Sequence, residues 1–216
     1  WWGIRWLVMV TAATDCEKLA KLQMVKKRLF DLMLSIFGLL CSWWLIGVAF
    51  LASSIDTRGN GFFTQKRVGM EGKLFTLIKI KTMRPDSELK TTVTQTGDPR
   101  ITRLGHLFRK SKIDELPQLW NILVGDMSFV GPRPDVPGFA DRLKGEERLL
   151  LSVRPGITGP ATLKYRNEED ILAAQTDPEA YNRDIIYPDK VKINLDYIRN
   201  WRLMDDIKYI IQTVIG

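Results

Sequence analysis

The chain has 216 residues, enough for one globular domain with a hydrophobic core, or for a smaller domain joined to a membrane element. Its 32 Lys and Arg outnumber its 25 Asp and Glu, which favours an anionic partner such as nucleic acid, anionic lipid or a phosphorylated substrate. With one histidine and two widely separated cysteines, Cys16 and Cys41, neither a zinc site nor a disulfide is expected, and both thiols are predicted to be unpaired in a reducing compartment.

The N-terminal stretch is apolar but short. Its first ten residues read WWGIRWLVMV, which is about half the length that a membrane-crossing helix needs. We therefore interpret residues 1–25 as an interfacial anchor or as the remainder of a longer membrane region, and base no functional argument on them.

A membrane segment is expected at residues 26–56, where 24 consecutive residues from Leu32 to Ile55 carry no charge. As one straight helix this run would be about 36 Å long, against about 30 Å for the hydrocarbon core of a bilayer. Basic residues flank it on both sides, so both ends are predicted to lie in the cytoplasm. We therefore predict a re-entrant helix, with a simple spanning helix and a buried core helix as alternatives. Asp31, at the start of the run, could pair with Arg28 at the level of the lipid headgroups.

A β-hairpin is predicted next. Its two runs, Gly61 to Arg67 and Lys73 to Met83, are separated by the turn-rich sequence VGMEG. Alternation along the second run brings Lys79 and Lys81 to one face. Two amines on one side indicate an anion contact, although a solvated polar face explains them equally well.

The remaining chain alternates loops with helical patterns. A polar surface loop is expected at 85–100, helical spacing in 101–113 and again after Asp114, and an irregular loop in the Gly- and Pro-rich segment 125–138. The last segment, 204–216, is apolar enough to lie on a membrane surface or under the domain. The predicted fold class is thus α+β, with a re-entrant membrane helix, a β-hairpin packed on helices, and interfacial amphipathic helices. The glycines form neither a dinucleotide nor a P-loop fingerprint.

Two adjacent carboxylates stand in the sequence KSKIDELPQLWN, residues 110–121. Asp114 has the position of a helix N-cap and Pro117 fits a first helical turn, so local structure alone explains the motif. Chemistry is compatible with this interpretation, because a helix N-terminus favours an ionised Asp, which is a nucleophile toward phosphorus. Glu115 could reach the same phosphate and hold a cation. A positive field could come from Arg103, Arg109, Lys110, Lys112 and Arg133.

Several long motifs occur in order along the chain. They are KRLFDL before the apolar run, FFTQKRVG, FTLIKIKTM, GDPRITRLGHLFRKSKIDELPQLWNILVGDMSFVGPRP and RPGITGPATLKYRN. In these motifs the sequence resembles the bacterial sugar transferases known as monotopic phosphoglycosyl transferases. The resemblance extends from about Lys26 to the C-terminus.

This resemblance implies a membrane-bound transferase that moves a sugar 1-phosphate from a UDP-sugar to undecaprenyl phosphate and releases UMP. Such enzymes begin the assembly of bacterial O-antigen, capsule, exopolysaccharide or glycoprotein glycans. The catalytic domain, residues 57–216, would lie on the cytoplasmic face of the inner membrane. The expected partners are the UDP-sugar, undecaprenyl phosphate and membrane lipid, with no nucleic acid. The sugar, the glycan pathway and a homo-oligomer are left open.

The family pattern also implies roles for individual residues. Asp114 would attack the β-phosphorus and form an aspartyl phosphosugar intermediate, which the lipid phosphate then resolves. Glu115 would help to hold Mg²⁺, a cation that takes one or two carboxylates together with substrate phosphates. The implied substrate contacts are Arg109 and Arg133, supported by Lys81 and Asp196.

One departure concerns the membrane helix. The family commonly bends this helix at a Ser-Pro pair, whereas here Ser42 is followed by Trp43. A bend can therefore not come from proline's missing hydrogen-bond donor. Gly38, Gly47 or a hydrogen bond from Ser42 to the preceding turn is expected to replace it.

A different class of function would be a catalytically silent scaffold on the membrane surface, which uses its basic face to bind anionic lipid or a partner enzyme. Nucleic-acid binding is less favoured, because the aromatic residues cluster in the apolar run and near Trp120 and Trp201 instead of interleaving with a basic stripe.

Overall fold

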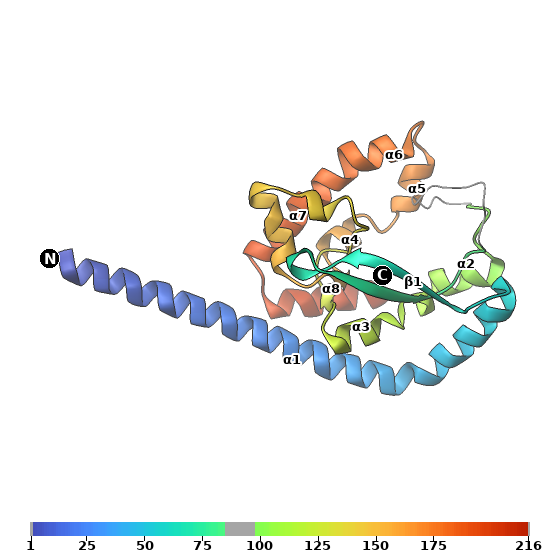
Figure 1. The fold of residues 1–216 in the computed structure, drawn as a ribbon, viewed down its shortest axis with the longest axis horizontal. Helices are drawn as coiled ribbons and strands as arrows, with labels where there is room; N and C mark the ends of the chain where they lie inside the picture. Colours follow the sequence, from blue (N-terminus) through green and yellow to red (C-terminus); the bar gives the residue numbers. More distant parts are fainter. Residues whose placement is uncertain (1, 85–97, 216) are drawn as a thin grey trace.

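The computed structural model describes residues 2–84 and 98–215, with side chains from residue 22 onward (Figure 1). It confirms the α+β class, and most of the loop predicted at 85–100 lies outside the described residues. The helices and strands are α1 (Trp2–Thr57), β1 (Phe62–Val68), β2 (Leu74–Ile80), α2 (Arg103–Lys110), the 3-10 turn η2 (Ile113–Glu115), α3 (Gln118–Val124), β3 (Ser128–Val130), the 3-10 segment η4 (Gly145–Ser152), β4 (Gly156–Thr158), α4 (Pro160–Lys164), α5 (Glu168–Ala173), α6 (Pro178–Tyr181), the π-helical turn η5 (Asn182–Ile186), α7 (Tyr187–Arg199) and α8 (Leu203–Ile215).

The predicted hairpin is confirmed as β1 and β2. The strands pair antiparallel, from Phe62 opposite Ile80 to Val68 opposite Leu74. The turn between them places Glu71 in the left-handed region, at φ 59°. The second strand ends at Ile80, so Lys81 follows the strand instead of belonging to it.

One face of β2 packs on α3, and β2 also contacts η2. Phe75 and Leu77 are buried on this face against Leu119 and Ile122. Burying each such side chain contributes about 1.5–3 kcal/mol. Lys79 is the next residue on the same face, since alternate strand residues point the same way. The packing of the apolar residues thus fixes the direction of this lysine.

Helix α1 is continuous from Trp2 to Thr57, so residue 25 marks no break in it. Figure 1 shows it passing beneath the domain and bending, so that its C-terminal part rises toward β1. Ser42 Oγ donates to Gly38 O at 2.7 Å, the kind of bond that bends helices. A Cβ on Gly38 would lie 3.1 Å from Leu119 Cδ1, so glycine lets α1 approach α3 closely. A path in and out of one leaflet stays a prediction.

Polar bonds tie α1 to the domain just before its apolar run. Arg28 donates to the carbonyl oxygens of Ile122 (2.6 Å) and Leu123 (2.8 Å), near the end of α3. A guanidinium in this position satisfies carbonyls that have no partner within the helix. Arg28 therefore anchors α3 to α1.

The side chain of Asp31 also bonds to the domain. The expected pairing of Asp31 with Arg28 at the level of the lipid headgroups is therefore wrong. Its side chain is 2% exposed, and Oδ1 accepts bonds from Ser128 Oγ and Phe129 N, each 3.1 Å long. The sequence could not reveal this contact, because its partners lie nearly 100 residues away.

Asp31→Ala is expected to lower the free energy of unfolding by about 2–4 kcal/mol, because it leaves two buried donors without an acceptor. Chemical denaturation of the purified protein in detergent measures this. Asp184→Ala is the control, since Asp184 is exposed and its one ion-pair partner among the described residues is neighbouring Arg183, and it should stay within about 0.5 kcal/mol of wild type. Equal stability of the two variants would contradict the assignment.

The C-terminal helix α8 is tied to α1 through Asp206, which is 1% exposed. Its carboxylate forms an ion pair with Lys27 and accepts bonds from Tyr197 Oη (2.6 Å) and Trp201 Nε1 (2.9 Å). Buried carboxylates need partners of this kind. The contacts place α8 under the domain, one of the two positions that its sequence predicts.

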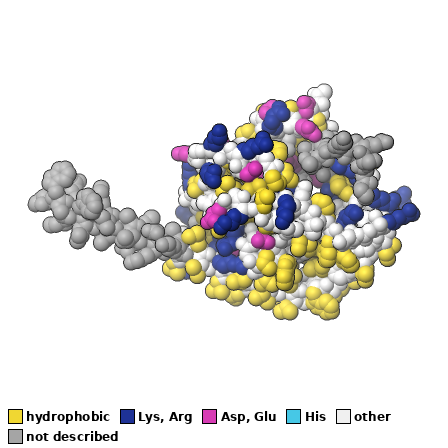
Figure 2. All heavy atoms as spheres, in the orientation of Figure 1, with side chains coloured by type: hydrophobic (Ala, Val, Ile, Leu, Met, Phe, Trp, Pro, Cys, Tyr) yellow, Lys and Arg dark blue, Asp and Glu magenta, His cyan; other side chains and the backbone are white. Residues whose placement is uncertain are grey.

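The apolar part of α1 faces outward. The segment Leu22–Thr57 is long and apolar enough to cross a membrane, judged by length and composition, and only 11% of its most apolar window is buried in the domain. Figure 2 shows hydrophobic side chains gathered along the lower edge of the molecule, over the part of α1 that underlies the domain. Exposed apolar residues there and on the adjoining α3 include Phe37, Leu40, Trp43, Trp44, Leu51, Trp120 and Val124. A patch of this kind fits a membrane surface.

Candidate active site

A tight turn between α2 and α3 places the two carboxylates. Lys112 adopts the left-handed conformation (φ 58°), and the chain then forms the separate 3-10 turn η2. Helix α3 begins only at Gln118, after Pro117. The expectation that Asp114 caps this helix is therefore wrong: the reversal at Lys112 starts a turn of its own, which contains both Asp114 and Glu115.

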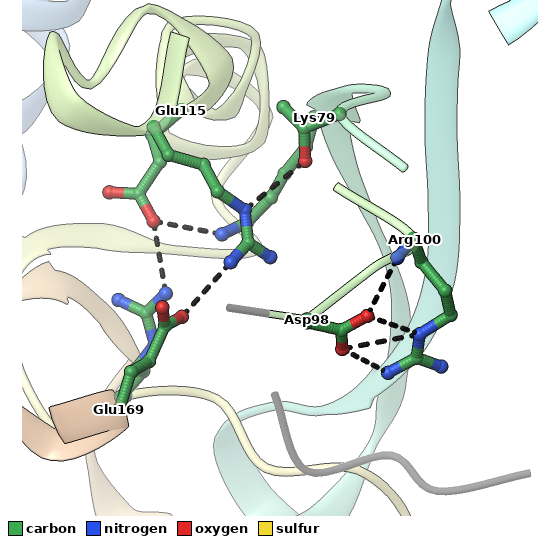
Figure 3. A network of polar contacts seen from close by, with 8 residues as sticks. Lys79, Asp98, Arg100, Glu115 and Glu169 are labelled. Carbon is green, nitrogen blue, oxygen red and sulfur yellow. Dashed lines mark hydrogen bonds and ion pairs between the residues drawn. The ribbon is translucent and has the colours of Figure 1, made fainter. Parts of the chain in front are cut away.

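Glu115 is held by two cations. Its Oε1 accepts bonds from Lys79 Nζ at 2.8 Å and from Arg133 NH2 at 2.9 Å. Figure 3 shows Lys79 from the hairpin facing Glu115. Burial alone would raise the pKa of Glu115, but Lys79 and Arg133 outweigh it and hold the pKa below its usual range. Glu115 is therefore ionised at neutral pH.

Asp114 is buried beside this group, with a side chain 7% exposed. Its Oδ1 has no hydrogen-bond partner among the described residues. Burial raises the pKa of Asp114, with Lys79 opposing the shift. The sequence argument expected the opposite direction from a helix N-terminus, and it fails because α3 begins four residues later. A buried carboxylate oxygen without a hydrogen-bond partner is uncommon and marks the position as one to explain by function.

Arg109 reaches the site from the last turn of α2. Its Nε donates to Thr82 Oγ1 at 3.2 Å, and NH1 donates to Glu169 Oε1 at 3.0 Å. Glu169 belongs to α5, and it lies below Glu115 and Lys79 in the view of Figure 3. This half-exposed ion pair joins α5 to the rim of the site, and an anionic substrate could exchange for the carboxylate.

The structure does not bring Lys81 and Asp196 into these contacts. Lys81 Nζ lies near Gly59, 3.8 Å from where a Cβ on that residue would be. Asp196 is exposed on α7, and its Oδ1 accepts a bond from Asn200 Nδ2 at 2.9 Å. Within the described part of the chain, neither side chain bonds to Asp114 or Glu115, and their predicted roles stay predictions.

The loop that carries Arg133 is fixed by β1. Arg67 NH1 donates to Pro134 O at 2.9 Å, and Val68 N donates to Asp135 O at 2.9 Å. Burial raises the pKa of Asp135 to about 6, against the opposing effects of Lys190 and Arg67. The loop is therefore anchored at Pro134 and Asp135.

This shift gives a pH prediction. The pKa of Asp135 in the folded state, about 6, exceeds the unfolded value of about 3.9, so its contribution to stability is present below about pH 4 and is lost as pH rises through 6. Asp135→Asn should abolish this loss. Between pH 4.5 and pH 7.5, its free energy of unfolding should therefore rise by about 1–2 kcal/mol relative to that of wild type. Denaturation at both pH values, with Asp184→Asn as the exposed control, measures the difference. Parallel pH profiles for wild type and Asp135→Asn would contradict it.

The model of one protein family, described as bacterial sugar transferase, matches residues 22–216. The chain belongs to this family. The match includes Asp114, Glu115 and every other residue of the site described above.

Individual relatives of this transferase are similar over most of its length. The undecaprenyl-phosphate glucose phosphotransferase of Komagataeibacter xylinus is 37% identical over 206 residues, covering 91% of this chain and 36% of its own. The protein named uncharacterized sugar transferase EpsL, from Bacillus subtilis, is 35% identical over 191 residues, covering 88% of this chain and 86% of its own. The UDP-glucose:undecaprenyl-phosphate glucose-1-phosphate transferase of Xanthomonas campestris is 34% identical over 200 residues, covering 88% and 38%. The chain thus spans little more than a third of two of these relatives.

The carboxylates of the transferase fit a magnesium ion only together with a substrate. Among the described residues, no group of three or more His, Cys, Asp and Glu could hold a metal. Mg²⁺ usually takes one or two protein carboxylates, substrate phosphates and water. The unpartnered Oδ1 of Asp114 and the adjacent Glu115, whose two donors both meet Oε1, suit that pattern.

Sequence reasoning missed two residues of the site. Lys79 was considered only as part of a pair with Lys81, although its place on the face of Phe75 and Leu77 is the signal that it points inward. Glu169 was not considered, and nothing in the sequence around it indicates that it meets Arg109, 60 residues earlier.

Proposed function

We propose that the protein transfers a sugar 1-phosphate from a UDP-sugar to undecaprenyl phosphate, releases UMP, and forms a covalent aspartyl phosphosugar on the way. The observation that carries this proposal is the unpartnered oxygen of buried Asp114 beside the cation-held Glu115. The names of the relatives from Komagataeibacter xylinus and Xanthomonas campestris support the choice of undecaprenyl phosphate as acceptor.

Asp114 is the better nucleophile of the two carboxylates. Glu115 Oε1 is already engaged by Lys79 and Arg133, and these two cations draw charge from the carboxylate and make it a weaker nucleophile. Asp114 Oδ1 has no bond to break. Burial raises the pKa of Asp114, but Lys79 opposes this shift and favours the ionised form that attacks.

The chemistry needs two displacements at one phosphorus. An oxygen of Asp114 attacks the β-phosphorus of the UDP-sugar, the bond from that phosphorus to the bridging oxygen breaks, and UMP leaves with the electron pair. An oxygen of the lipid phosphate then attacks the same phosphorus and expels the Asp114 carboxylate. Two steps suit the substrates, because one is water-soluble and the other is fixed in the bilayer.

Neighbouring cations would offset the charge of the phosphates. Arg133 and Lys79 stand beside Glu115, and Arg109 would exchange Glu169 for a phosphate oxygen. Mg²⁺, when held by Glu115 and the substrate, would supply Lewis-acid stabilisation of the leaving phosphate. Arg133 would then orient the diphosphate through hydrogen bonds.

Release of UMP tests the function. Purified full chain in nanodiscs, with Mg²⁺ and undecaprenyl phosphate, is incubated with a panel of UDP-sugars that begins with UDP-glucose and UDP-galactose. At least one donor should liberate UMP and yield a sugar diphosphate lipid. If the whole panel liberates no UMP while the protein binds anionic vesicles, the scaffold hypothesis holds instead.

The catalytic domain is proposed to stand on the cytoplasmic face of the inner membrane, with α1 as a re-entrant anchor. The basic flanks of the apolar run and the bend of α1 in Figure 1 support this placement. Lys26→Cys and Arg58→Cys, each made in a Cys16→Ser/Cys41→Ser background, report the two ends. An impermeant maleimide should label both only from the cytoplasmic side. Labelling of the two positions from opposite sides would establish a spanning helix.

A further inference from the structure

A small polar pocket adjoins the site between β1, β2, α3 and the loop 131–135. Its lining includes the side chains of Arg67, Lys79, Gln118 and Arg133, together with Pro134 and Gly156. No Asp or Glu lines it, so its charged groups are all positive. Arg133, the most exposed of these charged side chains for which a contact is described, is about half exposed and also bonds to Glu115.

Two donors in this pocket have nothing to bond. Gln118 is 3% exposed, and its Nε2 has no hydrogen-bond partner among the described residues. Arg67 Nε is also buried and without a partner there, although Arg67 NH1 is satisfied by Pro134 O. Buried donors are rarely left unpaired, so an acceptor is expected to occupy the pocket.

The size of the pocket limits that acceptor. A space of about 20 Å³ holds roughly one water molecule, or one oxygen atom of a larger group whose remainder stays outside. The positive lining favours an anionic oxygen over a neutral one. Lys79 and Arg133 line the pocket and also bond to Glu115, so the pocket adjoins the carboxylates.

We propose that this pocket binds one non-bridging oxygen of a substrate phosphoryl group, with Gln118 Nε2 and Arg67 Nε as the donors. The inference rests on the proposed function and adds Gln118 as a catalytic residue that touches the phosphoryl group. The oxygen could belong to the diphosphate of the donor or to the phosphate of the lipid. In the displacement it would act as an oxyanion hole, since donors fixed in advance stabilise charge that grows on this oxygen.

Gln118→Met tests the proposal, because it removes the donor at similar volume. Binding of UDP, inorganic pyrophosphate and undecaprenyl phosphate to the full chain in nanodiscs is measured by calorimetry. Weakening by about tenfold for UDP and pyrophosphate alone assigns the oxygen to the nucleotide sugar. Weakening for undecaprenyl phosphate alone assigns it to the lipid, and weakening for all three shows that both substrates use the pocket. Unchanged affinity for all three overturns the proposal and leaves a water site.

Two further variants separate binding from folding. Gln118→Glu puts a carboxylate among Arg67, Lys79 and Arg133, so it should fold at least as well as wild type. The added negative charge should repel the phosphoryl oxygen and weaken binding of the anionic probes. Wild-type affinity in Gln118→Glu would overturn the proposal even if Gln118→Met fails to fold. Asn194→Leu is the matched control, since Asn194 is buried on α7, its Oδ1 has no partner among the residues that the structure describes, and it lies outside the pocket lining. It should bind all three probes normally.

Turnover gives an independent readout. Loss of this donor should lower kcat about 100-fold, beyond the loss in binding of the probes, because the contact strengthens in the transition state. Binding of the three probes does not require catalysis. UMP release that is insensitive to Gln118 would therefore refute the pocket and leave the proposed function intact. If binding of the probes depends on Gln118 but no donor releases UMP, the pocket is supported and the proposed function is contradicted.

Discussion

Asp114→Asn is expected to reduce UMP release by at least about 10⁴-fold, because an amide is not a nucleophile toward phosphorus and the remaining groups only bind and polarise the substrate. The same change should leave stability equal or higher at neutral pH. Burial raises the pKa of Asp114, so its charged form costs free energy in the folded state, and the neutral amide removes that cost.

The paired measurements are steady-state UMP release and the midpoint of thermal unfolding. Asp126→Asn is a control on the far end of α3, where the carboxylate accepts a bond from Asn121 at 3.3 Å, and it should keep most of the turnover. Turnover by Asp114→Asn within tenfold of wild type would remove Asp114 from the role of nucleophile.

Lys79→Met is expected to be the most damaging change on the hairpin. It leaves the buried carboxylate of Glu115 with Arg133 as its one remaining ion-pair partner in the described part of the chain, which should cost about 2–4 kcal/mol of stability. Turnover should fall about 100-fold, since Glu115 would lose the contact that fixes its position. Denaturation and UMP release of the purified variant measure the two effects.

The companion variants isolate the pair. In Lys79→Met/Glu115→Gln the buried charge is gone, so stability should return toward wild type while turnover stays low. Lys66→Met, on an exposed lysine of the same hairpin that bonds to Thr76, is the control for removing an amine. The contacts predict a much smaller effect for Lys81→Met than for Lys79→Met. A larger effect for Lys81→Met would favour the assignment made from the sequence.

Local patterns accounted for the elements whose partners are near in sequence. The hairpin followed from two alternating runs around a turn, and the structure adds its register, which begins with Phe62 opposite Ile80. The pairing of β3 with β4 was not predicted, because each has three residues within a segment rich in Gly and Pro. That contact needs glycine, since a Cβ on Gly156 would lie 2.2 Å from Gly131 N.

The sequence predicted which residue types form the site better than it predicted how they are arranged in space. The adjacent carboxylates and the basic residues around them were visible in the sequence, and Arg133 indeed meets Glu115. Long-range partners decided the rest, since Lys79 lies 36 residues from Glu115 and Asp31 lies 97 residues from Ser128. Burial also reversed the expected direction of the pKa shift of Asp114, an effect that only the packed structure reveals.

The covalent intermediate is the claim on which the account depends, and mass spectrometry of enzyme mixed with a UDP-sugar alone tests it most directly. Without undecaprenyl phosphate the second displacement cannot occur, so the adduct should accumulate. The account predicts an added mass equal to a sugar phosphate on the peptide that contains Asp114, released when undecaprenyl phosphate is supplied. An adduct on another residue, or turnover with no adduct under these conditions, would contradict it.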